Sequence, residues 1–185
     1  MSAATPPWLV AIGASGGEGL RDIEQVLAAL PVPLPAVLLV VLHRPWGRPS
    51  DMRCILARKC PHPVVIGDAS QTLEAGTVYI GEPAQHLALA PRNLGVLIDD
   101  PHRAYGNRTI DLLFSSLAEH ATGGGRRIIG VILSGSLDDG SRGLARIPQR
   151  PGNHDGSHAP IPVRQRDAGE RHQLWWPDRR DWQRL

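Results

Sequence analysis

The sequence is poor in cysteine and lysine, and it contains no long hydrophobic run. Cys54 and Cys60 are its only cysteines, and their spacing forms neither a Cys-x-x-Cys metal pair nor a disulfide framework. The longest apolar segment, Pro31 to Leu42, is interrupted by proline and is shorter than the roughly 20 residues of a membrane helix. The first seven residues contain no basic side chain, so they do not look like a secretory signal. These absences favour a reducing, cytoplasmic location without membrane insertion.

The chain also carries little net positive charge. The 185 residues include 20 Lys or Arg and 18 Asp or Glu, which gives a net charge of +2. Residues 2–147 carry 13 basic and 13 acidic side chains, whereas residues 148–185 carry 7 and 5. Because a nucleic-acid surface needs clustered Lys and Arg, the neutral main part argues against a nucleic-acid partner. The length is sufficient for one domain with a buried core.

Strand and helix patterns alternate along the chain. Apolar runs typical of buried strands cover 8–12, 36–42, 64–66 and 127–133. Helical spacing of apolar residues predicts helices within 20–30, 51–58 and 110–117. Three closely spaced pieces predict a small antiparallel insertion: Thr77–Ile80, Leu87–Ala90 and Leu94–Ile98. The expected fold is therefore α/β, with a mainly parallel, doubly wound, Rossmann-like sheet flanked by helices and carrying that insertion.

Three predicted strands end in residues that suit a hydrolase. Ser15 follows the first strand within Gly13–Gly17, His43 ends the second, and Asp138 and Asp139 follow the last within Ser134–Gly140. The carboxyl ends of parallel strands share one edge of a sheet, so these side chains are expected to meet. A serine hydrolase needs a nucleophile, a base and a carboxylate that orients the base. Each residue alone fits a simpler role, such as a helix cap or a turn, and only the combination favours catalysis.

Other chemistries fit parts of this pattern. The glycine turn is typical of short-chain dehydrogenases, but His43 and Arg44 replace the acidic residue expected after the second strand, and no Tyr-x-x-x-Lys is present. The α/β-hydrolase elbow also fits, yet its chain order is Ser, acid, His. The histidines of residues 1–147 are scattered and include no His-x-x-x-His pair, so neither a metal nor another cofactor is expected.

The chain resembles the catalytic domain of CheB-type chemotaxis receptor methylesterases over about Trp8 to Ile147. The matching segments are Ala11-Ile-Gly-Ala-Ser-Gly-Gly17, Leu42-His-Arg-Pro45, Leu73-Glu-Ala-Gly-Thr-Val-Tyr-Ile80, Pro83-Ala-Gln-His-Leu87, Thr109-Ile-Asp-Leu-Leu-Phe114 and Gly130-Val-Ile-Leu-Ser-Gly-Ser-Leu-Asp-Asp-Gly140. The resemblance implies hydrolysis of glutamate methyl esters on methyl-accepting chemotaxis receptors, and deamidation of receptor glutamines at the same site. It also implies roles for individual residues: Ser15 as nucleophile, His43 as general base, Asp139 as orienting carboxylate, and Gly16 and Ser136 at the oxyanion hole.

Residues 148–185 depart from that family. They contain only four Val, Ile, Leu or Met residues and show no helical or strand period. We therefore expect a disordered or frameshifted tail, a domain of residues 1–147 that is incomplete at its C-terminal end, and a loosely held Asp139 with weakened activity. Only seven residues precede the first strand, so we expect either a stand-alone esterase domain or regulation supplied by a partner, such as a separate receiver-domain protein. The alternative to an enzyme is a non-catalytic signalling or interaction module with the same fold.

Overall fold

The computed structural model describes residues 8–46, 50–68, 71–121, 127–133 and 139–147. Their central feature is a five-stranded sheet in the order β3-β5-β2-β1-β8, in which every pair of neighbours is parallel. Its strands are β1 (Trp8–Ser15), β2 (Ala36–His43), β3 (Val64–Ile66), β5 (Val78–Ile80) and β8 (Arg127–Ile132). The mainly parallel α/β fold predicted from the sequence is confirmed.

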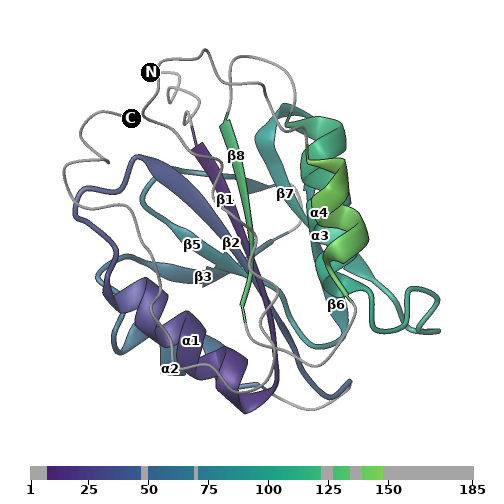
Figure 1. The fold of residues 1–185 in the computed structure, drawn as a ribbon, viewed down its shortest axis with the longest axis horizontal. Helices are drawn as coiled ribbons and strands as arrows, with labels where there is room; N and C mark the ends of the chain where they lie inside the picture. Colours follow the sequence, from purple (N-terminus) through teal and green to yellow (C-terminus); the bar gives the residue numbers. More distant parts are fainter. Residues whose placement is uncertain (1–7, 47–49, 69–70, 122–126, 134–138, 148–185) are drawn as a thin grey trace.

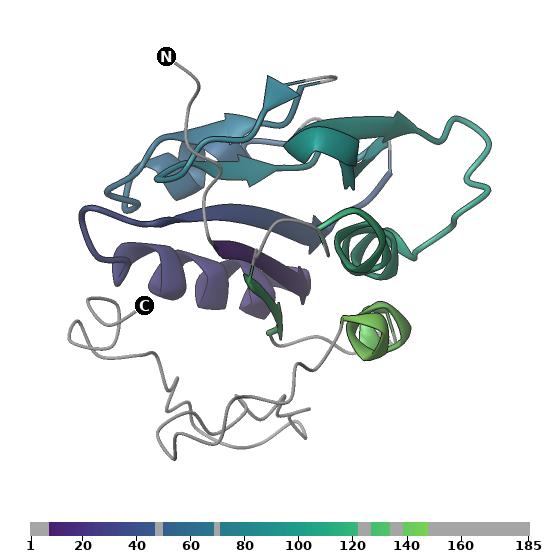
Figure 2. The same cartoon turned by 90° about the horizontal axis from the view of Figure 1, so that it is seen from above.

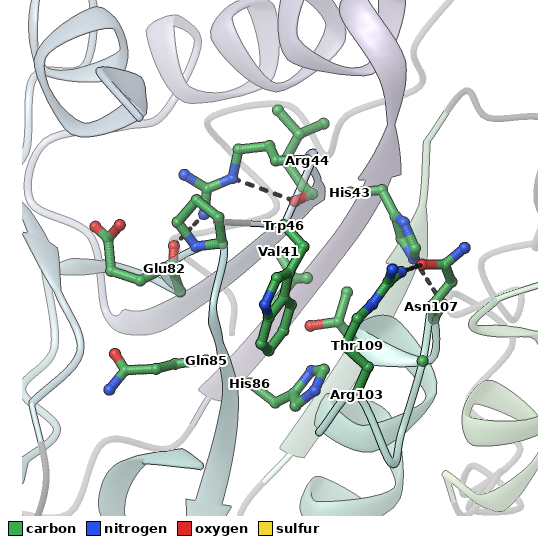
Figure 3. A pocket seen from close by; sticks show the side chains of 14 residues that line it. Val41, His43, Arg44, Trp46, Glu82, Gln85, His86, Arg103, Asn107 and Thr109 are labelled. Carbon is green, nitrogen blue, oxygen red and sulfur yellow. Dashed lines mark hydrogen bonds between the residues drawn. The ribbon is translucent and has the colours of Figure 1, made fainter. Parts of the chain in front are cut away.

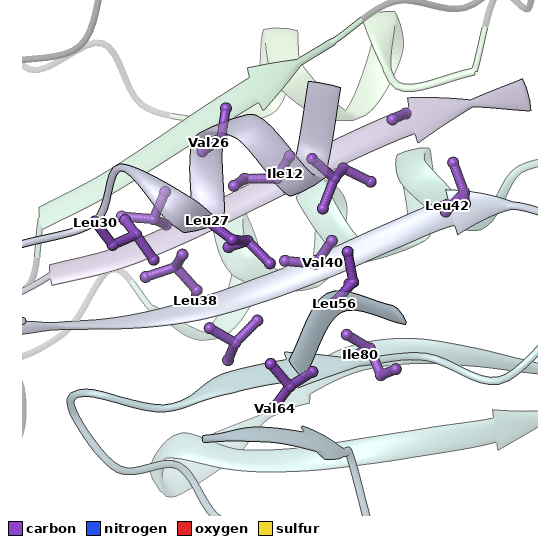
Figure 4. Close-up of a cluster of buried hydrophobic side chains, with 14 of the residues drawn as sticks. Ile12, Val26, Leu27, Leu30, Leu38, Val40, Leu42, Leu56, Val64 and Ile80 are labelled. Carbon is purple, nitrogen blue, oxygen red and sulfur yellow. The ribbon is translucent and has the colours of Figure 1, made fainter. Parts of the chain in front are cut away.

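Helices cover both faces of this sheet (Figure 1). They are α1 (Gly16–Ala28), α2 (Met52–Ala57), α3 (Thr109–His120) and α4 (Ser141–Arg146). Because successive strand residues point to opposite faces, β2 contributes Leu38 and Val40 to one core and Val37 and Leu39 to the other. The first core packs under α1 and α2 (Figure 4), and the second packs under α3.

A second, three-stranded antiparallel sheet has the order β4-β7-β6. Its strands are β4 (Gln71–Thr72), β6 (Gln85–Ala90) and β7 (Leu94–Asp99), with the short 3-10 helix η1 (Pro91–Asn93) between the last two. The prediction that Thr77–Ile80 belongs to this insertion is wrong, because β5 pairs in parallel with β2 and β3. All three side chains of β5 are buried, as a central strand of a covered sheet requires.

The first strand is longer than the predicted 8–12, since β1 continues to Ser15. Gly13 lies inside this strand, and a Cβ there would lie 2.3 Å from Cγ2 of Ile110 on α3. Gly13 therefore allows close contact with a helix, while the turn begins at Gly16, whose φ is +70°. Helix α4 is an additional element that the apolar periodicity did not indicate.

The helices that follow β1 and β8 lie on opposite faces of the sheet. Strand β1 leads directly into α1, whereas the chain after β8 reaches α4, which packs beside α3 away from α1 (Figure 2). In open α/β sheets, ligands bind at the carboxyl edge where neighbouring connections diverge in this way. Within the described ranges, no helix combines the length and the apolar character that crossing a bilayer requires.

Candidate active site

Ser15 and His43 lie side by side at the carboxyl edge of the sheet. They are the last residues of β1 and β2, and they are direct partners in the parallel register. Neighbouring strands are about 4.8 Å apart, which places the two side chains within reach of each other. Ser15 is also the N-cap residue of α1, but its hydroxyl accepts no hydrogen bond from that helix. Among the described residues, no hydrogen bond joins Ser15 to His43 in this conformation.

The ring of His43 is held through one nitrogen. Its Nε2 lies 2.6 Å from the carbonyl oxygen of Asn107 (Figure 3) and 3.0 Å from Oδ2 of Asp139. A backbone carbonyl can only accept, so Nε2 carries the proton of the neutral ring and Nδ1 keeps its lone pair. The hydrogen bond to Asp139 raises the pKa of His43, and partial burial opposes this rise without cancelling it.

Asp139 is fixed at the start of α3. Its Oδ2 accepts the N–H of Ile110 and its Oδ1 accepts the N–H of Asp111, both at 2.8 Å. These N–H groups are free at a helix N-terminus, where the helix dipole also favours a carboxylate. The expectation of a loosely held Asp139 is wrong, because its support comes from α3, an element that precedes residue 147.

A pocket opens beside His43 at this edge of the sheet (Figure 3). Residues that line it include Arg44, Trp46, Glu82, His86, Arg103 and Asn107. The Arg44 guanidinium donates hydrogen bonds to the Ser50 hydroxyl and to the Gly81 carbonyl oxygen, so it holds the wall of the pocket together. Burial lowers the pKa of Arg44, and the charge of Glu82 counteracts that effect.

The loop that presents Asn107 is anchored by a buried pair. Nε2 of His86 lies 3.1 Å from Oδ2 of Asp100, and the side chains are 3% exposed. The Asp100 carboxylate also accepts the N–H groups of Ala104 at 2.6 Å and Tyr105 at 3.0 Å. Burial raises the pKa of Asp100, and the hydrogen bonds from His86 and from these N–H groups lower it. The hydrogen bonds together have the larger effect, so the pKa of Asp100 lies below its usual value. The anchored loop keeps the Asn107 carbonyl against His43.

The structure thus brings three predicted residues to one edge, with Ser15 beside His43 and His43 bonded to Asp139. Gly16 begins α1 next to Ser15, while Ser136 lies outside the described residues. Sequence reasoning gave no role to the Asn107 carbonyl, to His86 or to Asp100, because no local pattern marks a backbone carbonyl or a buried hydrogen-bonded pair. No cluster of three His, Cys, Asp or Glu side chains suited to a metal ion occurs in the described part of the chain.

The chain is similar to proteins of known family. A family model described as CheB methylesterase matches residues 10–154. Protein-glutamate methylesterase/protein-glutamine glutaminase 1 of Bordetella avium is 34% identical over 149 residues, which cover 80% of this chain and 42% of that protein. A protein-glutamate methylesterase/protein-glutamine glutaminase of Salmonella typhimurium is 34% identical over 144 residues, covering 76% of this chain and 40% of that protein.

The fold agrees as well. The crystal structure of the Thermotoga maritima CheB methylesterase catalytic domain matches with a TM-score of 0.65 and 26% sequence identity, over 75% of this chain and 73% of that one. The chain spans about two fifths of the length of the curated relatives named above. Because the family model covers most of the sequence and the relatives exceed 30% identity, the chain belongs to the CheB methylesterase family.

Proposed function

We propose that this chain hydrolyses methyl esters of glutamate side chains on methyl-accepting chemotaxis receptors, with Ser15, His43 and Asp139 as its catalytic triad. The observation that carries the proposal is the contact of His43 with Asp139 on one side and its register pairing with Ser15 on the other. The names of the curated relatives support the choice of substrate.

The proposed reaction begins with proton transfer from the Ser15 hydroxyl to Nδ1 of His43, while Nε2–H stays bonded to Asp139. The serine oxygen attacks the ester carbonyl carbon, and backbone N–H groups at Gly16 and Ser136 stabilise the resulting oxyanion. The intermediate collapses when the methoxy group takes the proton from Nδ1 and leaves as methanol. Water then attacks the acyl-enzyme with the same base, which releases the glutamate and restores Ser15.

The same acyl-enzyme accounts for deamidation. If the substrate is a receptor glutamine, the leaving group is ammonia in place of methanol, and the later steps are identical. The glutaminase activity in the names of the relatives supports this second substrate.

The direct test is methanol release from a methylated receptor fragment by the full chain. Ser15→Ala and His43→Ala are expected to abolish it, whereas His120→Ala, a histidine at the end of α3, serves as the matched control. A serine-directed phosphonate is expected to add its mass to Ser15 alone. Labelling of another residue, or full activity of His43→Ala, would overturn the mechanism. A wild-type chain as inert as Ser15→Ala would support a non-catalytic module.

A further inference from the structure

Two aspartates at the junction of α3 and α4 bind each other's helix. Asp139, which precedes α4, accepts the N–H groups of Ile110 and Asp111 in the first turn of α3. Asp111, in that turn, accepts in return the N–H groups of Gly140 at 3.0 Å and Gly143 at 2.7 Å through its Oδ1. Each carboxylate therefore holds the segment that carries the other.

Glycines allow the two segments to approach this closely. Gly140 has a φ of +103°, and a Cβ there would lie 2.7 Å from Cγ2 of Ile110. At Gly143 a Cβ would lie 2.7 Å from the carbonyl oxygen of Asp111. Helix α4 accordingly packs directly against α3, as Figure 1 shows. The close backbone contact between α3 and α4 therefore fixes the position of Asp111.

We propose that Asp111 is a positioning residue that holds Asp139 against His43. The N–H of Gly140 belongs to the peptide bond that follows Asp139, so the Asp111–Gly140 hydrogen bond fixes the backbone next to the Asp139 side chain. The bond to Gly143 fixes the next turn of the same segment. The consequence for catalysis rests on the proposed function, whereas the consequence for the geometry of His43 does not.

Asp111 acts only through Asp139. Its side chain binds backbone N–H groups, and it is not among the residues that line the pocket beside His43. Its loss is therefore expected to change the rate of the chemical step and the ionisation of His43, and to leave substrate binding nearly unchanged. A change of kcat at nearly constant KM is the expected kinetic result.

The test is an NMR titration of the His43 ring in the full chain, measured without substrate. Asp111→Ala is expected to lower the pKa of His43 toward that of Asp139→Asn, because Asp139 is no longer held at hydrogen-bond distance. Asp111→Asn is expected to recover most of the wild-type pKa, since an amide oxygen can accept the same two N–H groups. Arg44, Glu82, His86 and Arg103, the other charged or titratable groups around the pocket, are unchanged in all these variants.

Kinetics supply the second readout. Asp111→Ala is expected to lower kcat about 100-fold, the effect of moving a catalytic group by about 1 Å, and Asp111→Asn is expected to recover most of the rate. Ala118→Gly is the matched control, because it destabilises the same helix at a position remote from both aspartates. It is expected to keep the wild-type pKa of His43 and the wild-type kcat. Should Asp111→Ala not fold, Asp111→Ser replaces it, since its hydroxyl is too short to reach both N–H groups.

The proposal is overturned if folded Asp111→Ala, or its replacement, retains the wild-type pKa of His43. It is also overturned if Asp111→Asn is as impaired as Asp111→Ala, because a charge and not an acceptor would then be required. If the wild-type chain releases no methanol, the proposed function fails. The titration still decides the role of Asp111, because it needs no turnover.

Discussion

Replacing Asp139 by asparagine tests the geometry of the site most sharply. The carboxylate accepts three hydrogen bonds, two through Oδ2 from His43 and Ile110 and one through Oδ1 from Asp111. Asparagine has only one side-chain oxygen, so its amide N–H₂ must face at least one N–H donor. The favoured orientation keeps the oxygen at the Oδ2 position and leaves only the Asp111 N–H unpaired, whereas the reverse orientation leaves two donors unpaired.

This orientation sets the expected magnitudes. One buried, unpaired N–H costs about 1–3 kcal/mol, so the free energy of unfolding of Asp139→Asn is expected to fall by about that amount. The oxygen still accepts from His43, so the tautomer of the ring is preserved and only the charge is lost. Charge-assisted hydrogen bonds are about twice as strong as neutral ones, which predicts a loss in kcat of about 10- to 100-fold. Triads in which this substitution inverts the tautomer lose about 10⁴-fold.

Urea unfolding of the full chain and methanol release measure the two quantities. Asp99→Asn is a suitable control, because Asp99 is exposed and accepts its hydrogen bond from Gln85 in the antiparallel sheet. Its free energy of unfolding is expected to change by less than about 0.5 kcal/mol. An unchanged free energy of unfolding for Asp139→Asn would show that Asp139 does not accept the three hydrogen bonds described above. A 10⁴-fold loss of kcat would show that the tautomer argument is wrong.

The sequence was sufficient to predict the residues at the carboxyl edge. Buried parallel strands are continuous apolar runs, so the polar residue that follows each run marks the end of a strand. Ser15, His43 and the pair of Asp138 and Asp139 were found in this way, and the family resemblance then selected Asp139. The structure places Ser15, His43 and Asp139 at the predicted edge. The contacts among these residues could not be predicted in the same way. They depend on the strand order β2-β1-β8 and on the register of Ser15 with His43, which are set by packing between distant segments.

The residues that support the triad were not predictable for the same reason. Asn107 acts through a backbone carbonyl, which is identical in every amino acid, and its position depends on the buried contact between His86 and Asp100. Asp111 lies in the segment Thr109–Phe114 that matches the family, but nothing in the sequence links it to Asp139. The strand β5 was misassigned because three apolar residues show no period, so its partners depend on the sheet around it.

Two further predictions follow from the site. Because the bond to Asp139 raises the pKa of His43, kcat/KM is expected to fall with decreasing pH already above 6.5, the ordinary value for histidine, and a pH profile measures this. The raised pKa of His43 also stabilises the folded state, and this stabilisation depends on pH in the opposite direction to the activity. It is complete below the pKa of His43 in the unfolded state and is lost as the pH rises through the pKa of His43 in the folded state. In Gly140→Ala, the new Cβ meets Ile110 at a left-handed φ, so we expect a loss of about 1–3 kcal/mol in unfolding free energy and a displaced Asp139. Gly106 has a φ of +55°, within the left-handed region that other residues can adopt, and no atom lies within 4 Å of its Cβ, so Gly106→Ala is expected to lose only about 1 kcal/mol. Equal losses in the two variants, measured by urea unfolding, would show that contact with Ile110 does not position the segment that carries Asp139.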